Sequence, residues 1–249
     1  MLFIRSFAFN FLFYSWTALC CLTSTLSFLM PMKVSLYLSK IWSKVSLGLA
    51  KYILGLDYRV EGAEHLPKTC GGFIVACKHQ STWETIVFST LLENPSFVLK
   101  RSLMYIPFVG LFLKKLNMIP VERSTRSRSD LRLMLKKAAQ VIHQGQPIVI
   151  FPEGTRTLPG EPSVYHTGVY SLYQHLNVPV VPIGLNSGLF WGRRTFLKKP
   201  GTISLCVGPL IKPGLKRADF MNVLKERIEG ACTSTRHKAA HGFQATQSF

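Results

Sequence analysis

His79 is the residue of this sequence whose type and position best suit acid–base chemistry. It follows the apolar run from Gly72 to Cys77, which predicts a strand, and precedes residues 82–92, which have helical character. An imidazole changes its charge near neutral pH and can take a proton from a hydroxyl group. Glu84 is close enough in sequence for its carboxylate to orient the ring. Alternatively, Ser81 and Glu84 have the spacing of a capping box, in which Glu84 binds backbone instead.

A second polar segment, Phe-Pro-Glu-Gly-Thr-Arg, follows the apolar residues 148–150. Gly154 permits unusual backbone angles and the close approach of a ligand. Thr155 can donate a hydrogen bond, and Arg156 can hold a phosphate through two parallel hydrogen bonds. The alternative interpretation is an ordinary turn in which Glu153 and Arg156 pair with each other.

Basic residues stand at two further predicted strand ends. Lys100 and Arg101 follow residues 97–99, and Arg123 follows residues 118–121. In α/β proteins the carboxyl ends of parallel strands meet at one edge of the sheet, where ligands bind. The sequence therefore predicts one crevice that holds a base, carboxylates and several cations.

The elements that would position these residues alternate along the chain between strands and helices. This alternation predicts the α/β class, with a mixed, largely parallel sheet covered by helices. We expect this domain at residues 57–232, followed by a disordered tail at residues 233–249. The expected strands are 57–61, 72–77, 96–99, 118–121, 147–151, 178–185 and 202–207, and the expected helices are 82–92, 129–143, 164–176 and 217–229.

Residues 1–56 have a different character and predict attachment to a membrane. No charged residue occurs from Ser6 to Met32, a length that can span a bilayer, although its Ser and Thr residues also fit a shallow helix that does not span. Lys33, Lys40, Lys44 and Lys51 then fall within roughly 20° of one line on a helix, opposite an apolar face. This pattern is typical of a helix in the membrane interface, or of an amphipathic helix packed on the domain.

The overall charge narrows the class of partner. Lys and Arg number 30 against 12 Asp and Glu, which gives a formal net charge of +18 and points to an anionic partner. The six cysteines form no CxxC pair and are typical of reduced thiols, so we expect the catalytic domain on the cytoplasmic face of the membrane. The sequence contains no GxSxG nucleophile elbow, which argues against a hydrolase of that type.

Four blocks of the sequence together resemble the 1-acyl-glycerol-3-phosphate acyltransferases of the glycerolipid acyltransferase family. That family carries an HxxxxD block, a basic block, an FPEGTR block and a strand containing Val-Pro, in this order. Here the blocks are residues 79–84, 98–123, 151–156 and 181–188, and the resemblance covers roughly residues 58–214. One position departs from the pattern, because Glu84 stands where the family usually has Asp.

The resemblance implies transfer of a fatty acyl group from an acyl thioester, on coenzyme A or acyl carrier protein, to the sn-2 hydroxyl of 1-acyl-glycerol-3-phosphate. His79 would be the general base and Glu84 its orienting carboxylate. Pro182 would line the side of the acyl donor. No metal, cofactor or covalent acyl-enzyme is implied. The phosphate and its pocket would be served by Lys100, Arg101, Arg123, Glu153, Gly154, Thr155 and Arg156.

Two rival hypotheses remain open. A related acyltransferase acting on a lyso-ornithine lipid or on glycerol 3-phosphate would share the same blocks. From another class, a membrane-tethered nucleic-acid-binding protein would also be strongly basic. The sequence shows no zinc-ligand spacing and no basic helix suited to a groove, which argues against this second rival.

Overall fold

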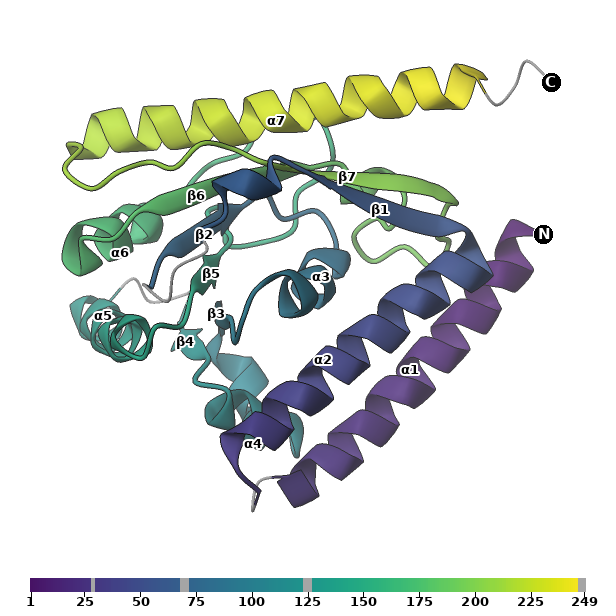
Figure 1. The fold of residues 1–249 in the computed structure, drawn as a ribbon, viewed down its shortest axis with the longest axis horizontal. Coiled ribbons are helices and arrows are strands. Elements are labelled where there is room, and N and C mark those ends of the chain that lie inside the picture. Colours follow the sequence, from purple (N-terminus) through teal and green to yellow (C-terminus); the bar gives the residue numbers. More distant parts are fainter. Residues whose placement is uncertain (28–29, 68–71, 123–126, 246–249) are drawn as a thin grey trace.

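A seven-stranded sheet forms the centre of the computed structural model, which describes residues 1–27, 30–67, 72–122 and 127–245 (Figure 1). The strand order is β1-β7-β6-β2-β5-β3-β4. Strands β6, β2, β5, β3 and β4 are mutually parallel, whereas β7 pairs antiparallel to β6 and parallel to β1. The strands are β1 (Leu56–Glu61), β2 (Ile74–Cys77), β3 (Ser96–Lys100), β4 (Ile119–Val121), β5 (Ile148–Ile150), β6 (Val180–Leu185) and β7 (Gly201–Val207).

Helices cover both faces of this sheet, as the sequence predicts. Successive side chains of a strand point to opposite faces, and in β2 Ile74 and Ala76 enter one core while Val75 and Cys77 enter the other. One face carries α5 (Arg128–His143), α6 (Gly168–Leu176) and α7 (Arg217–Ala245), and the other carries α1 (Leu2–Ser27), α2 (Met32–Leu49), α3 (Trp83–Leu91) and α4 (Val109–Lys115). Short helical turns η1 (Ala50–Leu54), η2 (Ala63–His65), η3 (Arg101–Tyr105) and η4 (Ser187–Leu189) join them.

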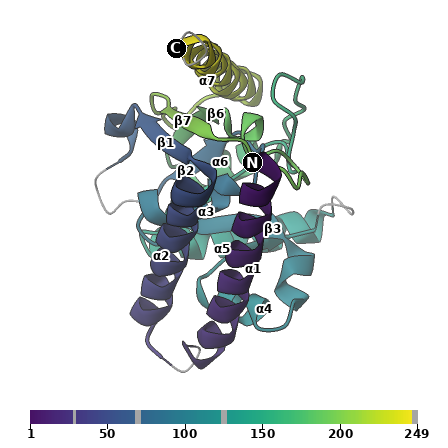
Figure 2. The ribbon, with the colours of Figure 1, turned by 90° about the vertical axis from the view of Figure 1, so that its right-hand side faces the viewer.

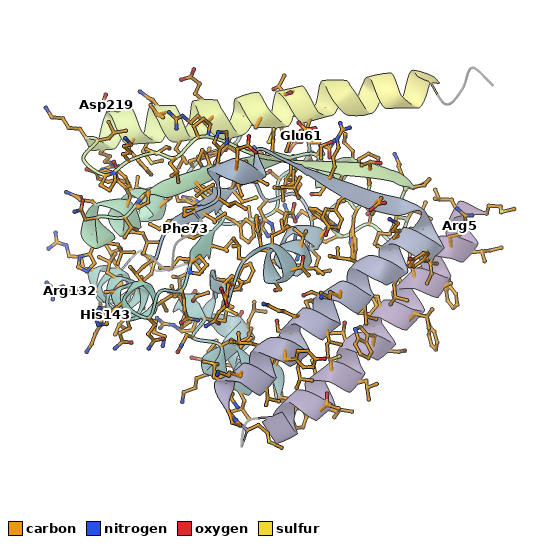
Figure 3. All side chains as sticks on the ribbon, in the orientation of Figure 1. Arg5, Glu61, Phe73, Arg132, His143 and Asp219 are labelled. Atoms are coloured by element: carbon orange, nitrogen blue, oxygen red, sulfur yellow. The ribbon has the colours of Figure 1, made fainter. Side chains whose placement is uncertain are left out.

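The helices present apolar stripes to the sheet and polar side chains to water. In α5, Met134, Ala138 and Val141 are buried, while Arg132 and His143 are exposed and project outward (Figure 3). This is the arrangement expected of an amphipathic helix on a core.

Helices α1 and α2 lie side by side and extend away from the sheet (Figures 1 and 2). The indole nitrogen of Trp16 donates to the carbonyl of Trp42, and that of Trp42 donates to Thr17 Oγ1 at 3.1 Å. On α2, Lys33 and Lys44 of the expected lysine stripe are exposed, whereas Lys40 is half-buried. The helix also packs on the domain, because small serines at its buried face allow close approach; these are Ser35, Ser43 and Ser46.

Helix α1 is the one described helix that is long and apolar enough to cross a membrane, with a candidate span at residues 2–23. Most of that span is not covered by protein, since 22% of its most apolar window is buried. Exposed side chains include Phe3, Phe7, Phe11 and Tyr14. The structure therefore supports a membrane-associated segment and leaves its depth in the bilayer as a prediction.

The expected disordered tail is wrong at its beginning, because α7 continues from Arg217 to Ala245. Phe220, Leu224, Ile228 and Cys232 recur at every fourth position and form a continuous buried stripe. One turn later Thr235 is also fully buried, and its carbonyl accepts a hydrogen bond from Asn186 Nδ2 at 2.9 Å. These long-range contacts stabilise a segment that looks polar and nonperiodic in the sequence.

Candidate active site

Three parallel strands bring the candidate catalytic groups to one edge of the sheet. Strands β2 and β5 end just before His79 and Glu153, and β6 ends just before Asn186 and Ser187. Because the three strands are adjacent and parallel, their carboxyl ends lie together. The edge therefore receives the histidine block, the FPEGTR block and the segment after β6.

The backbone at His79 is held by the FPEGTR loop on both sides. Its amide donates to Glu153 Oε1 at 3.4 Å, and its carbonyl accepts from the amide of Thr157 at 2.8 Å. The imidazole stacks on Phe151, with ring centroids 4.0 Å apart. These contacts fix where the ring lies before any substrate arrives.

Glu84 has the backbone-binding role that the sequence left open, and its carboxylate also faces His79. It is fully buried, and its carboxylate accepts hydrogen bonds from the amides of Gln80 and Ser81, each at 3.0 Å, and from Ser187 Oγ at 2.6 Å. Its Oε2 also lies 3.8 Å from His79 Nδ1. The Ser81 hydroxyl accepts from the amide of Trp83, so the capping box is formed in part.

The separation of 3.8 Å is longer than a hydrogen bond. Nδ1 of His79 is buried and has no hydrogen-bond partner among the described residues. A shift of less than about 1 Å would bring this nitrogen to Glu84, and catalytic hydrogen bonds often tighten only once substrate is bound. The pair is thus positioned for the orienting role.

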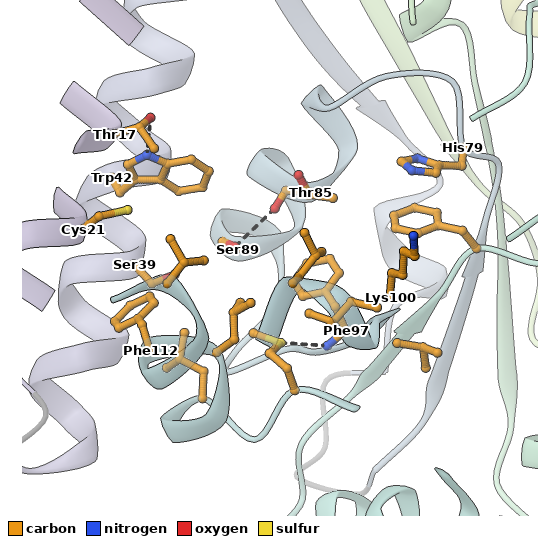
Figure 4. A pocket seen from close by; sticks show the side chains of 18 of the residues that line it. Thr17, Cys21, Ser39, Trp42, His79, Thr85, Ser89, Phe97, Lys100 and Phe112 are labelled. Atoms are coloured by element: carbon orange, nitrogen blue, oxygen red, sulfur yellow. Dashed lines mark hydrogen bonds between the residues drawn. The ribbon is translucent and has the colours of Figure 1, made fainter. Parts of the chain in front are cut away.

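A cavity of about 740 Å³ begins at His79 and extends between the N-terminal helices and the sheet (Figure 4). His79 and Lys100 lie at one end, and Thr17, Cys21 and Trp42 lie at the other. The wall between them is largely apolar and includes Phe97, Phe112, Leu113 and Met118. Such a volume is typical of a pocket for a small molecule or a lipid chain.

Four cationic side chains line the cavity. Lys100 and Arg156, both expected from the sequence, line it together with Arg193 and Arg194, which were not among the expected site residues. Thr155, also expected, lines it as well. Arg193 lies beside Arg156, because its Nη1 donates to the Arg156 carbonyl at 2.8 Å. Among the described residues no carboxylate forms an ion pair with these four cations.

The remaining expected site residues have other positions. Arg101 pairs with Asp130 of α5 at 2.7 Å and does not line the cavity. Pro182 is buried within β6, opposite Ala76, rather than on the cavity wall. Arg123 lies outside the described residues. Gly154 has φ +65° in the tight turn where its amide donates to the Phe151 carbonyl, a conformation that favours glycine.

Glu153 is buried below the cavity and does not pair with Arg156. It is 3% exposed, and its Oε1 lies 3.5 Å from Lys78 Nζ. Burial raises the pKa of its carboxyl to about 7, although the nearby Lys78 ammonium acts in the opposite direction. Glu153 therefore supports the loop that carries His79 and does not face the cavity.

This raised pKa gives a prediction for stability. A carboxyl that binds its proton more tightly when folded loses its stabilising contribution as pH rises through the folded pKa, here about 7. Glu153→Gln does not titrate at this position. Its free energy of unfolding relative to that of wild type should therefore rise between pH 5.5 and pH 8, by on the order of 2–3 kcal/mol, and its melting temperature relative to that of wild type should rise with it. Calorimetry at the two pH values measures this. A constant or falling difference would contradict the pKa assignment.

Among the described residues, no group of three His, Cys, Asp or Glu side chains is arranged to hold a metal ion. The arrangement instead offers a base, an adjacent carboxylate and cations at the mouth of an apolar cavity. These side chains suit a group-transfer reaction that involves an anionic amphiphile. The cations can hold the charged part of such a molecule, while the apolar wall accepts its chain.

Residues 57–186 match the acyltransferase family. This matched segment contains both the histidine block and the FPEGTR block. The chain belongs to this family. The expected membership in an acyltransferase family is thereby confirmed, as is the α/β fold with its mixed, mostly parallel sheet.

Two sequence relatives and one solved structure are similar to this chain over most of its length. The 1-acyl-sn-glycerol-3-phosphate acyltransferase of Pseudomonas aeruginosa is 34% identical over 195 residues, covering 78% of this chain and 74% of that protein. The enzyme of the same name from Bacillus subtilis is 31% identical over 183 residues, covering 72% and 85%. The crystal structure of the 1-acyl-sn-glycerophosphate acyltransferase PlsC from Thermotoga maritima has the same fold, with a TM-score of 0.76, 22% identity and coverage of 95% and 98%.

Proposed function

We propose that this protein transfers a fatty acyl group from an acyl thioester to the sn-2 hydroxyl of 1-acyl-glycerol-3-phosphate, giving phosphatidic acid. The observation that carries the proposal is the placement of His79, which faces Glu84, in the lining of a long apolar cavity. The same cavity is lined by cations that form no ion pair within the described part of the chain. The names of the relatives from Pseudomonas aeruginosa and Bacillus subtilis support the same reaction. The family result also favours this hypothesis over nucleic-acid binding.

His79 would act as the general base. Nδ1 faces Glu84, which leaves Nε2 for the acceptor hydroxyl. As the hydroxyl oxygen attacks the thioester carbon, Nε2 takes the hydroxyl proton, and the imidazolium is stabilised by the Glu84 carboxylate. The carbon–sulfur bond then breaks and the leaving thiolate receives that proton. The donor carries its acyl group on coenzyme A or on acyl carrier protein.

Lys100, Arg156, Arg193 and Arg194 would bind the phosphate of the acceptor, the phosphates of the donor, or both. Charged hydrogen bonds between Arg and phosphate are strong and directional. Holding both substrates at the site contributes to catalysis because it removes the need for a chance encounter, an effect of up to about 7–11 kcal/mol in favourable cases.

We also place the catalytic domain at the cytoplasmic face of a membrane. The exposed aromatic side chains of α1 would lie in the lipid, and the exposed lysines of α2 would stay near the anionic headgroups. Since α1 and α2 also line the far end of the cavity, a lipid chain could pass from the bilayer to His79 without crossing water.

Arg156→Ala is expected to raise the KM for the phosphorylated acceptor about tenfold, because one charged hydrogen bond to phosphate is lost. The KM for an acceptor without phosphate, 1-acylglycerol, should change little. Arg132→Ala is the matched control, since Arg132 is exposed on the outer side of α5 (Figure 3). Equal KM values for wild type and Arg156→Ala would remove Arg156 from phosphate binding.

A panel of acceptors tests the proposed substrate. The purified protein is given one acyl thioester and, in separate reactions, 1-acyl-glycerol-3-phosphate, glycerol 3-phosphate and a lyso-ornithine lipid. We expect the highest kcat/KM with 1-acyl-glycerol-3-phosphate. A higher value for either of the other two would transfer the assignment to a related acyltransferase of the same family.

A further inference from the structure

Lys78 precedes His79 in the chain, but its side chain points to the opposite face of the sheet. His79 lines the cavity on the side of α1 and α2, whereas the ammonium of Lys78 reaches Glu229 on α7. Lys78 is 1% exposed, although lysine is rarely buried to this extent unless it is paired. The catalytic scheme above does not use this buried charge.

The contacts of the Lys78 ammonium come from three separate parts of the chain. Nζ lies 2.5 Å from Glu229 Oε1, 2.6 Å from Ser163 Oγ and 3.5 Å from Glu153 Oε1. The hydroxyl of Tyr165 also donates to Glu229 Oε1, at 3.0 Å. One ammonium therefore joins the end of β2 to the FPEGTR loop, to the following loop and to α7.

The groups around the Lys78 ammonium connect Glu229 to the backbone of His79, so the loss of Glu229 should displace His79. Burial raises the pKa of the Tyr165 hydroxyl, with a further contribution from Glu153 and Glu229, so this hydroxyl stays a hydrogen-bond donor at neutral pH. Burial likewise raises the pKa of Cys232 to about 12, so its thiol is neutral. The ammonium lies between the carboxyl groups of Glu229 and Glu153, and Oε1 of Glu153 also accepts from the His79 amide.

We propose that Lys78 and Glu229 are positioning residues, which couple α7 to the FPEGTR loop and so hold the backbone that carries His79 in its reactive place. The proposal rests on the acyltransferase function proposed above. A displacement of about 1 Å at a catalytic group can cost up to 10²-fold in rate. An ion pair on the far side of the sheet can therefore affect turnover without touching substrate.

A second contact of α7 acts at the other member of the catalytic pair. The carbonyl of Thr235 accepts from Asn186 Nδ2, and the neighbouring Ser187 donates to Glu84 Oε1 at 2.6 Å. Helix α7 is thus connected to both His79 and Glu84 through residues that do not line the cavity.

The test compares Glu229→Ala, Glu229→Gln and Glu226→Ala in the full-length protein. Glu226 is exposed and lies one turn before Glu229 on the same helix, so it is a matched control. We expect Glu229→Ala to lower kcat about tenfold, with the KM of both substrates within about twofold of wild type. Glu229→Gln keeps an oxygen for Lys78 and Tyr165 and should recover most of the loss, while Glu226→Ala should equal wild type.

Tyr165→Phe provides a milder variant that preserves shape and removes only the hydroxyl bound to Glu229. It should lower kcat in the same direction by a smaller factor and leave KM unchanged. The proposal is overturned if folded Glu229→Ala has the kcat of Glu226→Ala, if KM changes instead of kcat, or if Tyr165→Phe is fully active when Glu229→Ala does not fold. If wild type itself forms no phosphatidic acid in this assay, it is the proposed function that fails, and the variants are then compared with whichever acceptor supports turnover.

Discussion

Replacing His79 by alanine is expected to lower kcat by about 10²–10⁴-fold, the usual contribution of a general base. The ring lines the cavity, and Phe151 and the FPEGTR loop hold it in place, so its loss removes the base without removing the cations. Binding of 1-acyl-glycerol-3-phosphate should therefore change by no more than about twofold, since phosphate binding depends on other residues. Steady-state kinetics and equilibrium binding of the acceptor measure the two effects separately.

His143→Ala is the matched control, because His143 is exposed at the end of α5, on the outer side of the sheet (Figure 3). It should keep wild-type kcat. A purified His79→Ala protein with near wild-type kcat would refute the assignment of the base. A large loss of acceptor binding in that variant would show that His79 holds the substrate instead.

Glu84→Gln is expected to lower kcat by about 10²–10³-fold, although the side chain keeps its size. The amide cannot stabilise the imidazolium as a carboxylate does. Its NH₂ group would also face backbone donors, because both oxygens of Glu84 accept from the Ser81 amide. The acceptor KM should stay close to that of wild type. Steady-state kinetics recorded for each variant at several pH values measures the loss.

Glu84→Asp separates charge from reach. It restores the residue usual in the family, keeps the charge and shortens the side chain by one methylene, so we expect it to retain at least a tenth of wild-type kcat. Glu93→Gln, an exposed site on the loop after α3, controls for the substitution itself. Equal kcat values for Glu84→Gln and Glu93→Gln would leave Glu84 with a structural role alone.

Most of the fold could be predicted because its signals are local. Short apolar runs predicted most of the strands, an alternating segment predicted the strand at residues 57–61, and the apolar spacing of residues 129–143 predicted α5. The errors occur where distant contacts decide the structure. Helix α6 begins at Gly168, four residues after the predicted start, because the preceding loop returns to the site, where the amide of His166 donates to the Pro152 carbonyl. Helices α1 and α4 enclose the cavity, but no sequence pattern showed that they would meet.

The candidate site was predicted in part for the same reason. Strand ends located His79, Lys100 and Arg156 correctly at one edge, because parallel strands bring their carboxyl ends together. The pairing of charges could not be predicted, since Arg101 and Lys78 find their carboxylates 29 and 151 residues away. Arg193 and Arg194 lie in the loop between η4 and β7 rather than at a predicted strand end, and their adjacent positive charges are the one sequence signal that could have indicated them.

The most direct test gives the purified protein 1-acyl-glycerol-3-phosphate with one chain length and an acyl thioester with another, and identifies the lipid product by mass spectrometry. The structure predicts phosphatidic acid that carries the thioester-derived chain at sn-2, formed by wild type and at a rate lower by at least about 10²-fold in His79→Ala. Release of free fatty acid without phosphatidic acid, or equal formation by the two proteins, would contradict the proposal that this imidazole activates the lipid hydroxyl.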